Sequence, residues 1–200
     1  GANGLPKTGA TNTGYYLHKF LFEDINLKAG QSSTFAHAFP LFRYADVFLN
    51  YAEAVNELYG PEVVPSELGT TMTALDAINK VRTRTGYLSA AIKPFASGEF
   101  TTKDAFRKEL RDEYAREFAF EDHRFWDIRR WKIGAETQKD IKRLRIKQVT
   151  DPDTGKKSFV YTVEVDVNAR VWDDKMYLYP IPQDERDKNK NLTQNPGWEE

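Results

Sequence analysis

The period of the apolar residues changes once along this chain, near Gly134, and this change constrains the fold more than any other feature. Before Gly134, apolar residues recur every three or four positions, which is the period of an α-helix. After it, the run KSFVYTVEVDV alternates between apolar and polar residues, as a β-strand does. The sequence therefore predicts a mainly helical protein, with helices over about 41–134, a β-rich part over about 141–182 and an extended tail over 183–200.

The first two predicted helices form a hairpin like one tetratricopeptide unit. From Leu41 the apolar residues fall on one face of a helix that Gly60-Pro61 ends; this apolar stripe consists of Tyr44, Val47, Phe48, Tyr51, Val55 and Leu58. The second helix covers TALDAINKVRTRTG, where Thr73 and Asp76 resemble a capping box and Gly86 is a C-terminal cap. Two amphipathic helices joined by a short loop predict an antiparallel helical hairpin.

A third and longer helix is predicted to start at Thr101 or Thr102. Four large apolar residues step by four along it, namely Phe106, Leu110, Tyr114 and Phe118. The same pattern continues through FEDHRFWDIRRWKIG to Gly134, so we expect one continuous helical stretch.

A β-hairpin is predicted after the helices, because IKRLRIKQV and KSFVYTVEVDV flank a turn of the type TDPDTGKK. Tyr177 to Ile181 is predicted as a short edge strand, since Pro180 and Pro182 cannot donate to a sheet. The residues after it are rich in Asn, Gln and Pro, and we expect them to be extended along the surface.

The charge and the cysteine content exclude several classes of protein. The 29 basic and 30 acidic residues leave a net charge of -1, so no global field favours nucleic acid. The chain has no cysteine, which excludes disulfides and thiolate metal sites within it. No apolar run approaches the roughly 20 residues that span a bilayer, and no signal peptide opens the chain. We interpret the chain as a piece of a longer protein.

Neither a metal, a cofactor nor a catalytic residue is predicted. His18, His37 and His123 lack the spacing of a metal motif. The turn DPDTGKK begins like a calcium loop, but the twelfth position from Asp151 is Thr162, where a glutamate is required. A hydrolase would need two carboxyl groups within about 5–9.5 Å. In one continuous helix Glu113 and Asp127 would lie about 21 Å apart, which argues against a hydrolytic pair.

Two groups of aromatic residues are candidates for ligand binding. The run EFAFEDHRFWDIRRW mixes aromatic residues with Arg and Asp, and its helical spacing favours a tightly packed helix end over a binding platform. Trp172, Tyr87 and Phe95 lie in predicted loops, where an exposed ring can stack on a sugar. For Trp172 the alternative is that it covers the apolar face of the hairpin.

Four stretches together resemble the C-terminal part of the SusD/RagB family. In chain order they are FPLFRYADVFLNYAEAVNE, ALDAINKVRTRTGY, LRDEYAREFAFEDHRFWDIRRW and YLYPIPQDERDKNKNLTQNPGW. The resemblance extends over roughly Gly14 to Trp198. It implies that the chain is a single C-terminal region over 1–200, with tetratricopeptide-like helices and a tail that forms a surface strap along the helices. It also implies that the motif residues are structural scaffold, namely Arg43, Asp46, Arg124, Asp127, Arg130 and Trp131.

The same resemblance implies a function in polysaccharide utilisation. Such proteins are non-catalytic, carry no cofactor, and are lipid-anchored at the cell surface of the outer membrane through an N-terminal segment absent from this chain. They bind oligosaccharides, or peptides in some members, and pass them to a SusC-like TonB-dependent transporter for nutrient uptake. The residues themselves leave a second hypothesis open, a tetratricopeptide-like scaffold for protein interactions that binds no small molecule. Such a scaffold would need a long concave helical groove, and only one helical hairpin is convincing in this sequence.

Overall fold

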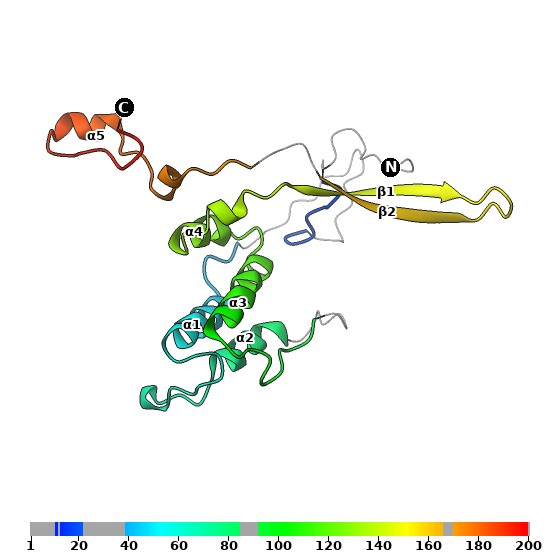
Figure 1. Cartoon of the computed structure of the whole chain (residues 1–200), viewed down its shortest axis with the longest axis horizontal. Helices are drawn as coiled ribbons and strands as arrows, with labels where there is room; N and C mark the ends of the chain where they lie inside the picture. Colours follow the sequence, from blue (N-terminus) through cyan, green and yellow to red (C-terminus); the bar gives the residue numbers. More distant parts are fainter. Residues whose placement is uncertain (1–10, 12, 22–38, 85–91, 166–169, 200) are drawn as a thin grey trace. The chain divides into compact units, whose positions relative to one another are not determined.

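The computed structural model describes residues 11, 13–21, 39–84, 92–165 and 170–199 (Figure 1). It divides into two compact units. The helical unit is Phe35–Asp127, and the hairpin unit combines Gly1–Thr34 with Ile128–Glu200. Within the described residues there are five α-helices and two β-strands, so the predicted mainly helical fold with a small β-hairpin is confirmed.

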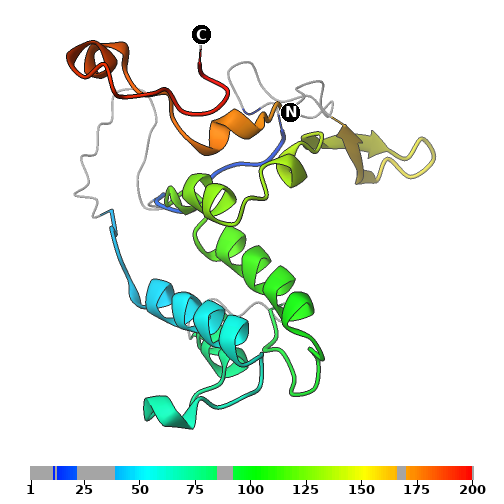
Figure 2. The ribbon, with the colours of Figure 1, turned by 60° about the vertical axis from the view of Figure 1, so that its left-hand side comes forward.

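Three helices build the core of the helical unit. Helix α1 (Tyr44–Leu58) packs against both α2 (Ala74–Arg82) and α3 (Lys103–Glu117), as Figure 2 shows. The side chains with almost no exposure in this core are Leu49, Ala52, Ala74, Ala77, Ile78, Phe106 and Leu110. Alanines on α1 and α2 leave room for the two helices to approach closely.

The starts of these helices follow the predicted local signals. The Asp76 carboxylate accepts from the Thr73 N–H at 2.9 Å, and the Thr73 hydroxyl accepts from the Asp76 N–H at 3.0 Å, which confirms the capping box. Thr102 caps α3 by accepting from the Ala105 N–H at 3.2 Å. Gly60, with a φ of 115°, follows the end of α1 as expected.

The apolar stripe of α1 coincides only in part with the face that the helical unit buries: Val55 is buried, and Phe48 and Tyr51 are half-buried. Tyr44, Val47 and Leu58 are 81%, 47% and 69% exposed, whereas Leu49 and Ala52 are fully buried. Helix α1 packs against both α2 and α3, and its small buried residues, Ala45 and Ala52, permit this close packing. The stripe predicted from periodicity therefore includes both buried residues and large residues that remain exposed here.

The predicted continuous helix from Thr102 to Gly134 is interrupted. Helix α3 ends at Glu117, and α4 (His123–Arg130) begins after a turn in which Phe120 and Asp122 have φ values of 65° and 63°. Arg43 Nη2 donates to the Glu117 carbonyl at 2.9 Å. Because this contact satisfies a carbonyl group at the helix end, α3 can stop there despite the apolar pattern that continues through the turn.

The β-hairpin consists of β1 (Lys142–Thr150) and β2 (Lys157–Val165), paired antiparallel with Ile146 opposite Tyr161. Asp151 Oδ1 closes the turn by accepting from the N–H groups of Thr154 and Asp153, both at 2.9 Å. These bonds, with that of Thr154 first, lower the pKa of the Asp151 carboxyl group. The predicted hairpin and its turn are thereby confirmed.

The residues after Tyr177 differ from both predictions made for them. No strand covers 177–181: a 3₁₀ helix (Asp174–Tyr177) is followed by irregular chain. The tail is not extended throughout either, because Gln183–Lys188 forms helix α5, with acidic residues in its first turn and basic ones in its last.

Side chains replace the missing strand partner of 177–181. The Gln194 side-chain amide accepts from the Ile181 N–H at 2.7 Å and donates to the Ile181 carbonyl at 2.9 Å. Asn195 Nδ2 donates to the Tyr179 carbonyl, and Trp198 Nε1 to the Lys175 carbonyl. Residues 189–198 thus fold back on residues 175–181. We call the whole segment, residues 175–198, the strap.

Candidate functional site

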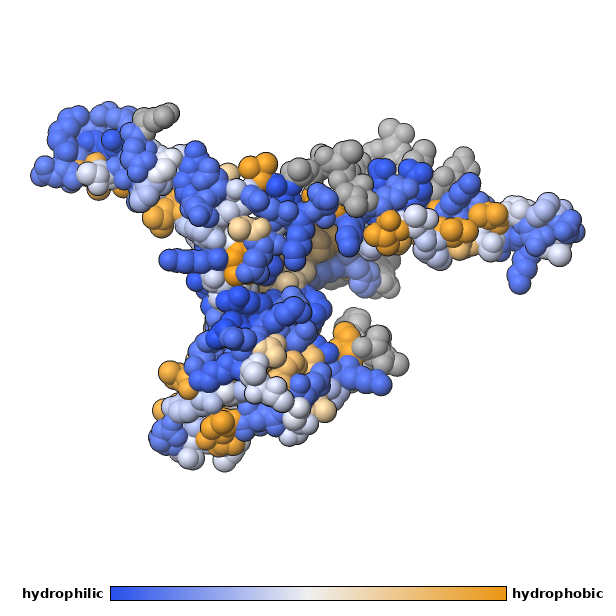
Figure 3. Space-filling model, viewed as in Figure 1, coloured by the Kyte–Doolittle hydropathy of each residue, from blue (hydrophilic) through white to orange (hydrophobic). Residues whose placement is uncertain are grey.

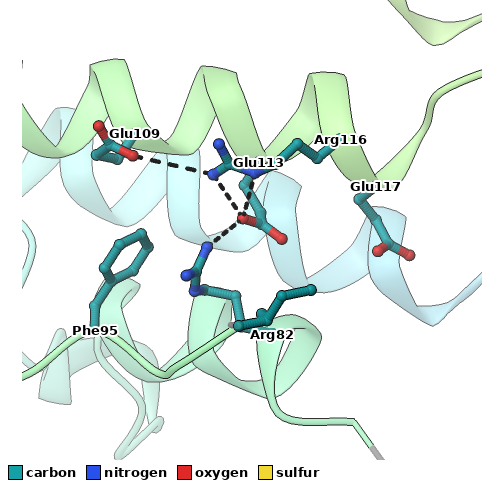
Figure 4. A pocket seen from close by; sticks show the side chains of 7 residues that line it. Arg82, Phe95, Glu109, Glu113, Arg116 and Glu117 are labelled. Carbon is teal, nitrogen blue, oxygen red and sulfur yellow. Dashed lines mark hydrogen bonds and ion pairs between the residues drawn. The ribbon is translucent and has the colours of Figure 1, made fainter. Parts of the chain in front are cut away.

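A pocket of about 370 Å³ lies within the helical unit (Figure 4). This volume is in the range of small-molecule sites. We call it the Phe95 pocket, and its lining residues come from α2, the loop before α3, and α3 itself: Arg82, Ile92, Phe95, Glu109, Glu113, Arg116 and Glu117.

The Phe95 backbone is fixed by Asn79 of α2. The Asn79 amide accepts from the Phe95 N–H at 2.8 Å and donates to the Phe95 carbonyl at 2.9 Å, as a neighbouring β-strand would. The Phe95 ring meets Phe100 edge-on, with ring centroids 5.0 Å apart. The Arg82 guanidinium lies 4.0 Å from the Phe95 centroid. The ring is therefore held in place before any ligand arrives.

The charged groups of the pocket compensate one another. The Glu113 carboxylate is buried, and it accepts from Arg82 Nη1 at 2.6 Å and from Arg116 Nη2 at 2.9 Å. Arg82 Nε also donates to the Lys93 carbonyl at 2.9 Å, which ties the loop to α2. Figure 4 shows Glu113 between the two guanidinium groups. Such an arrangement offers fixed hydrogen-bonding groups beside an aromatic ring.

The end of the pocket at Glu117 is anchored to the start of α1. The Glu117 carboxylate accepts from both Arg43 and Arg84, and Arg43 Nε donates to Glu121 at 2.8 Å. The Arg43 guanidinium also lies 4.8 Å from the Phe118 ring centroid. Arg43 therefore joins α1 to the turn that follows α3.

Asp46 lies in the same region, because its carboxylate accepts from the Arg43 N–H at 2.9 Å. His123 Nε2 is 3.1 Å from Asp46 Oδ1, and the His123 ring stacks on Phe118 with centroids 4.0 Å apart. The structure thus brings Arg43 and Asp46, two of the predicted scaffold residues, into one contact region of the helical unit.

The other four predicted scaffold residues lie on or just after α4, and none of them lines the Phe95 pocket. Asp127 is buried, and the Arg130 guanidinium lies 4.4 Å from the Trp131 ring centroid. Arg124 is exposed.

Trp172 does not stand free on a loop. Its half-buried indole lies against Gly134 and meets Tyr177 edge-on, with ring centroids 4.8 Å apart. The Arg129 guanidinium is 5.5 Å from the indole, and the Gly134 N–H donates to the Tyr177 hydroxyl at 2.9 Å. Of the three predicted ligand-binding residues, Phe95 lies in the pocket, Trp172 lies in this packed contact, and Tyr87 falls outside the described residues.

Sequence reasoning did not assign Asn79 and Arg82 to the site. Both occur in the run INKVR, three positions apart, and this spacing places them on the same side of α2. A polar pair on one side of an amphipathic helix was the signal that could have located the Phe95 loop. Glu113, named from the sequence as half of a hydrolytic pair, forms an ion pair with Arg116 along α3 and a second with Arg82 of α2.

Among the residues described, no group of three or more His, Asp or Glu side chains is arranged to hold a metal ion. Nor does any helix in the described segments combine the length and apolar character that crossing a bilayer requires.

Comparison with known proteins gives one consistent result. The chain is 29% identical over 157 residues to SusD-like protein P2 of Formosa agariphila, covering 78% of this chain and 25% of that protein. It is 34% identical over 118 residues to SusD-like protein P25 of the same organism, covering 58% of this chain and 20% of that protein. The crystal structure of a SusD-like protein from Bacteroides fragilis superposes with a TM-score of 0.61 at 30% identity, covering 88% of this chain and 29% of that one.

The chain thus spans between 20% and 29% of the length of these relatives. The family model described as the SusD family matches residues 1–198, nearly all of the chain. The chain therefore belongs to the SusD family, whose members are non-catalytic binding proteins.

Proposed function

We propose that the complete protein binds oligosaccharides at the cell surface and delivers them to a SusC-like TonB-dependent transporter in the outer membrane. Membership of the SusD family supports the binding class and this partnership. In the proposed arrangement, a lipid anchor on a segment that precedes this chain holds the protein to the outer membrane. The protein captures its ligand without transforming it.

The Phe95 pocket is the observation that supports a ligand site in this part of the protein. A sugar ring presents an apolar face that can stack on an aromatic side chain, and its hydroxyl groups both donate and accept hydrogen bonds. Phe95 offers the ring, Arg116 offers donors, and Glu109 offers an acceptor. Because Asn79 and Arg82 fix the loop in advance, little ordering entropy opposes binding.

A glycan array probed with the complete protein tests the proposal, with release of reducing sugar recorded in parallel. We expect binding without release. The Phe95→Ala variant should bind the captured glycan about tenfold more weakly, as expected for the loss of one aromatic contact. The control is Phe120→Ala, because Phe120 is an exposed aromatic residue of the same unit that does not line the pocket. Equal affinities for the two variants would remove the Phe95 pocket as the glycan site.

A peptide is the second candidate ligand, because the pocket combines guanidinium and carboxylate groups that could pair with both ends of a zwitterion. A peptide library probed with the same two variants distinguishes the two ligands. Capture of peptides but no glycan, weakened by Phe95→Ala and not by Phe120→Ala, would replace the oligosaccharide as the ligand class.

A further inference from the structure

One face of the β-hairpin carries a cluster of apolar residues in its middle part. The register places Leu144 opposite Val163 and Ile146 opposite Tyr161, and alternation puts Phe159 on the same face. We call this set the hairpin apolar face. Phe159, Tyr161 and Val163 are 54%, 64% and 61% exposed. Figure 3 shows apolar residues gathered along the hairpin.

The opposite face of the hairpin is mainly polar, with Val149 and Val160 as its apolar residues, and it contains paired charges. Arg143 Nε and Arg145 Nε each lie 3.1 Å from the Glu164 carboxylate. These ion pairs are compatible with water on that side. Antiparallel sheets of this kind commonly pack their apolar face on a core and expose their polar face to water.

Within the described residues the sheet has no third strand. A two-stranded hairpin with an uncovered apolar face is marginally stable at best in water. Contiguous apolar surface of this kind marks a contact with another part of the polypeptide or with a partner. The hairpin apolar face thus needs a cover whenever the protein is folded.

The structure indicates where that cover comes from. Residues near the start of the chain already reach the hairpin, since the Leu144 N–H donates to the Thr13 carbonyl at 2.8 Å. The relatives are also three to five times longer than the part that this chain matches. We infer that the polypeptide preceding this chain in the complete protein packs on the hairpin apolar face. A cover from the same polypeptide is always present, whereas a transporter or a second copy would leave the free protein with an unsupported hairpin.

Thiol labelling tests the inference, because the chain itself contains no cysteine. The variants Val163→Cys and Val160→Cys form a matched pair: both sites are valines of β2, 61% and 49% exposed, and they lie on opposite faces of the hairpin. Each variant of the complete protein is labelled with a maleimide under native conditions and in denaturant. Labelling of the parent protein supplies the background.

For each variant we take the ratio of the labelling rate under native conditions to the rate in denaturant. We expect this ratio to be at least about tenfold lower for Val163→Cys than for Val160→Cys. The difference should be independent of protein concentration and present without the transporter. Equal relative rates at the two sites would overturn the inference. Protection of Val163→Cys that appears only at high protein concentration, or only with transporter present, would overturn it in favour of a second copy or of the transporter.

Discussion

The contact between Gly134 and Trp172 leads to a prediction about stability. A Cβ atom at Gly134 would lie 1.8, 2.1 and 2.3 Å from three carbons of the indole, where carbon atoms normally approach to about 3.5–4.0 Å. Gly134 has φ -55° and ψ -46°, so alanine meets no backbone strain there. The sign of the effect of Gly134→Ala is therefore decided by the indole, which cannot bend aside as a flexible chain end could.

Two estimates give a similar magnitude for Gly134→Ala. Overpacking of a well-packed contact costs about 1–3 kcal/mol. If the indole instead swings out, it exposes on the order of 100 Å² of apolar surface, which costs about 2.5 kcal/mol. We therefore expect Gly134→Ala to lower the free energy of unfolding by about 2 kcal/mol. Urea denaturation followed by circular dichroism measures this change.

A double-mutant cycle isolates the cause. In a Trp172→Ala background the clash is absent, so Gly134→Ala should be neutral or slightly stabilising. The coupling between the two sites should be about 2 kcal/mol. If Gly134→Ala has the same effect with and without Trp172, the packed contact does not hold this segment together, and the reasoning fails.

Two further predictions concern ion pairs of the helical unit. Arg43→Lys should lower the free energy of unfolding by about 3 kcal/mol, because a single ammonium group cannot pair with both Glu117 and the nearly buried Glu121. An unchanged midpoint of urea denaturation would contradict this prediction. Hydrogen bonds from Arg107 lower the pKa of the Glu57 carboxyl group in the folded protein. The ionised carboxylate therefore stabilises the folded protein fully above the unfolded pKa of about 4.3. This stabilisation is lost as the pH falls through the lower folded pKa. Glu57→Gln should therefore be less stable than the parent at pH 6, and the gap should narrow at pH 3 in parallel urea titrations.

Features of the fold that depend on near neighbours in the sequence were predictable. The capping box joins Thr73 to a residue three positions away, and the turn of the hairpin is closed by Asp151 in the same way. The residue types and their spacing in the sequence are enough to predict such local hydrogen bonds. The helix starts and the hairpin were accordingly predicted close to their observed positions.

The predictions that were wrong concern features that depend on residues distant in the sequence. The break after α3 is stabilised by Arg43, 74 residues from Glu117 and 78 from Glu121, and the apolar pattern through the turn carried no sign of it. Likewise, Gln194 takes the role expected of a strand next to Ile181. A side chain that substitutes for backbone pairing leaves no periodic signal in the sequence.

The candidate site was partly predictable for the same reason. Phe95 stood out as an aromatic residue in a loop, but the pocket around it is assembled from two helices and the loop before α3. Trp172 carried the same local signal and lies instead in a packed contact with Gly134. An aromatic residue in a loop therefore indicated a contact in each case, while the tertiary fold decided whether that contact was open to a ligand.

The strap has a consequence for the order in which the protein folds. Its closing hydrogen bonds join residues only 13, 16 and 23 positions apart, whereas those of Arg43 bridge 74 and 78. The entropy lost on closing a loop grows with its length, so the strap requires the shorter conformational search. Residues 175–198 can therefore close as a local folding event, ahead of the long-range contacts that complete the helical unit.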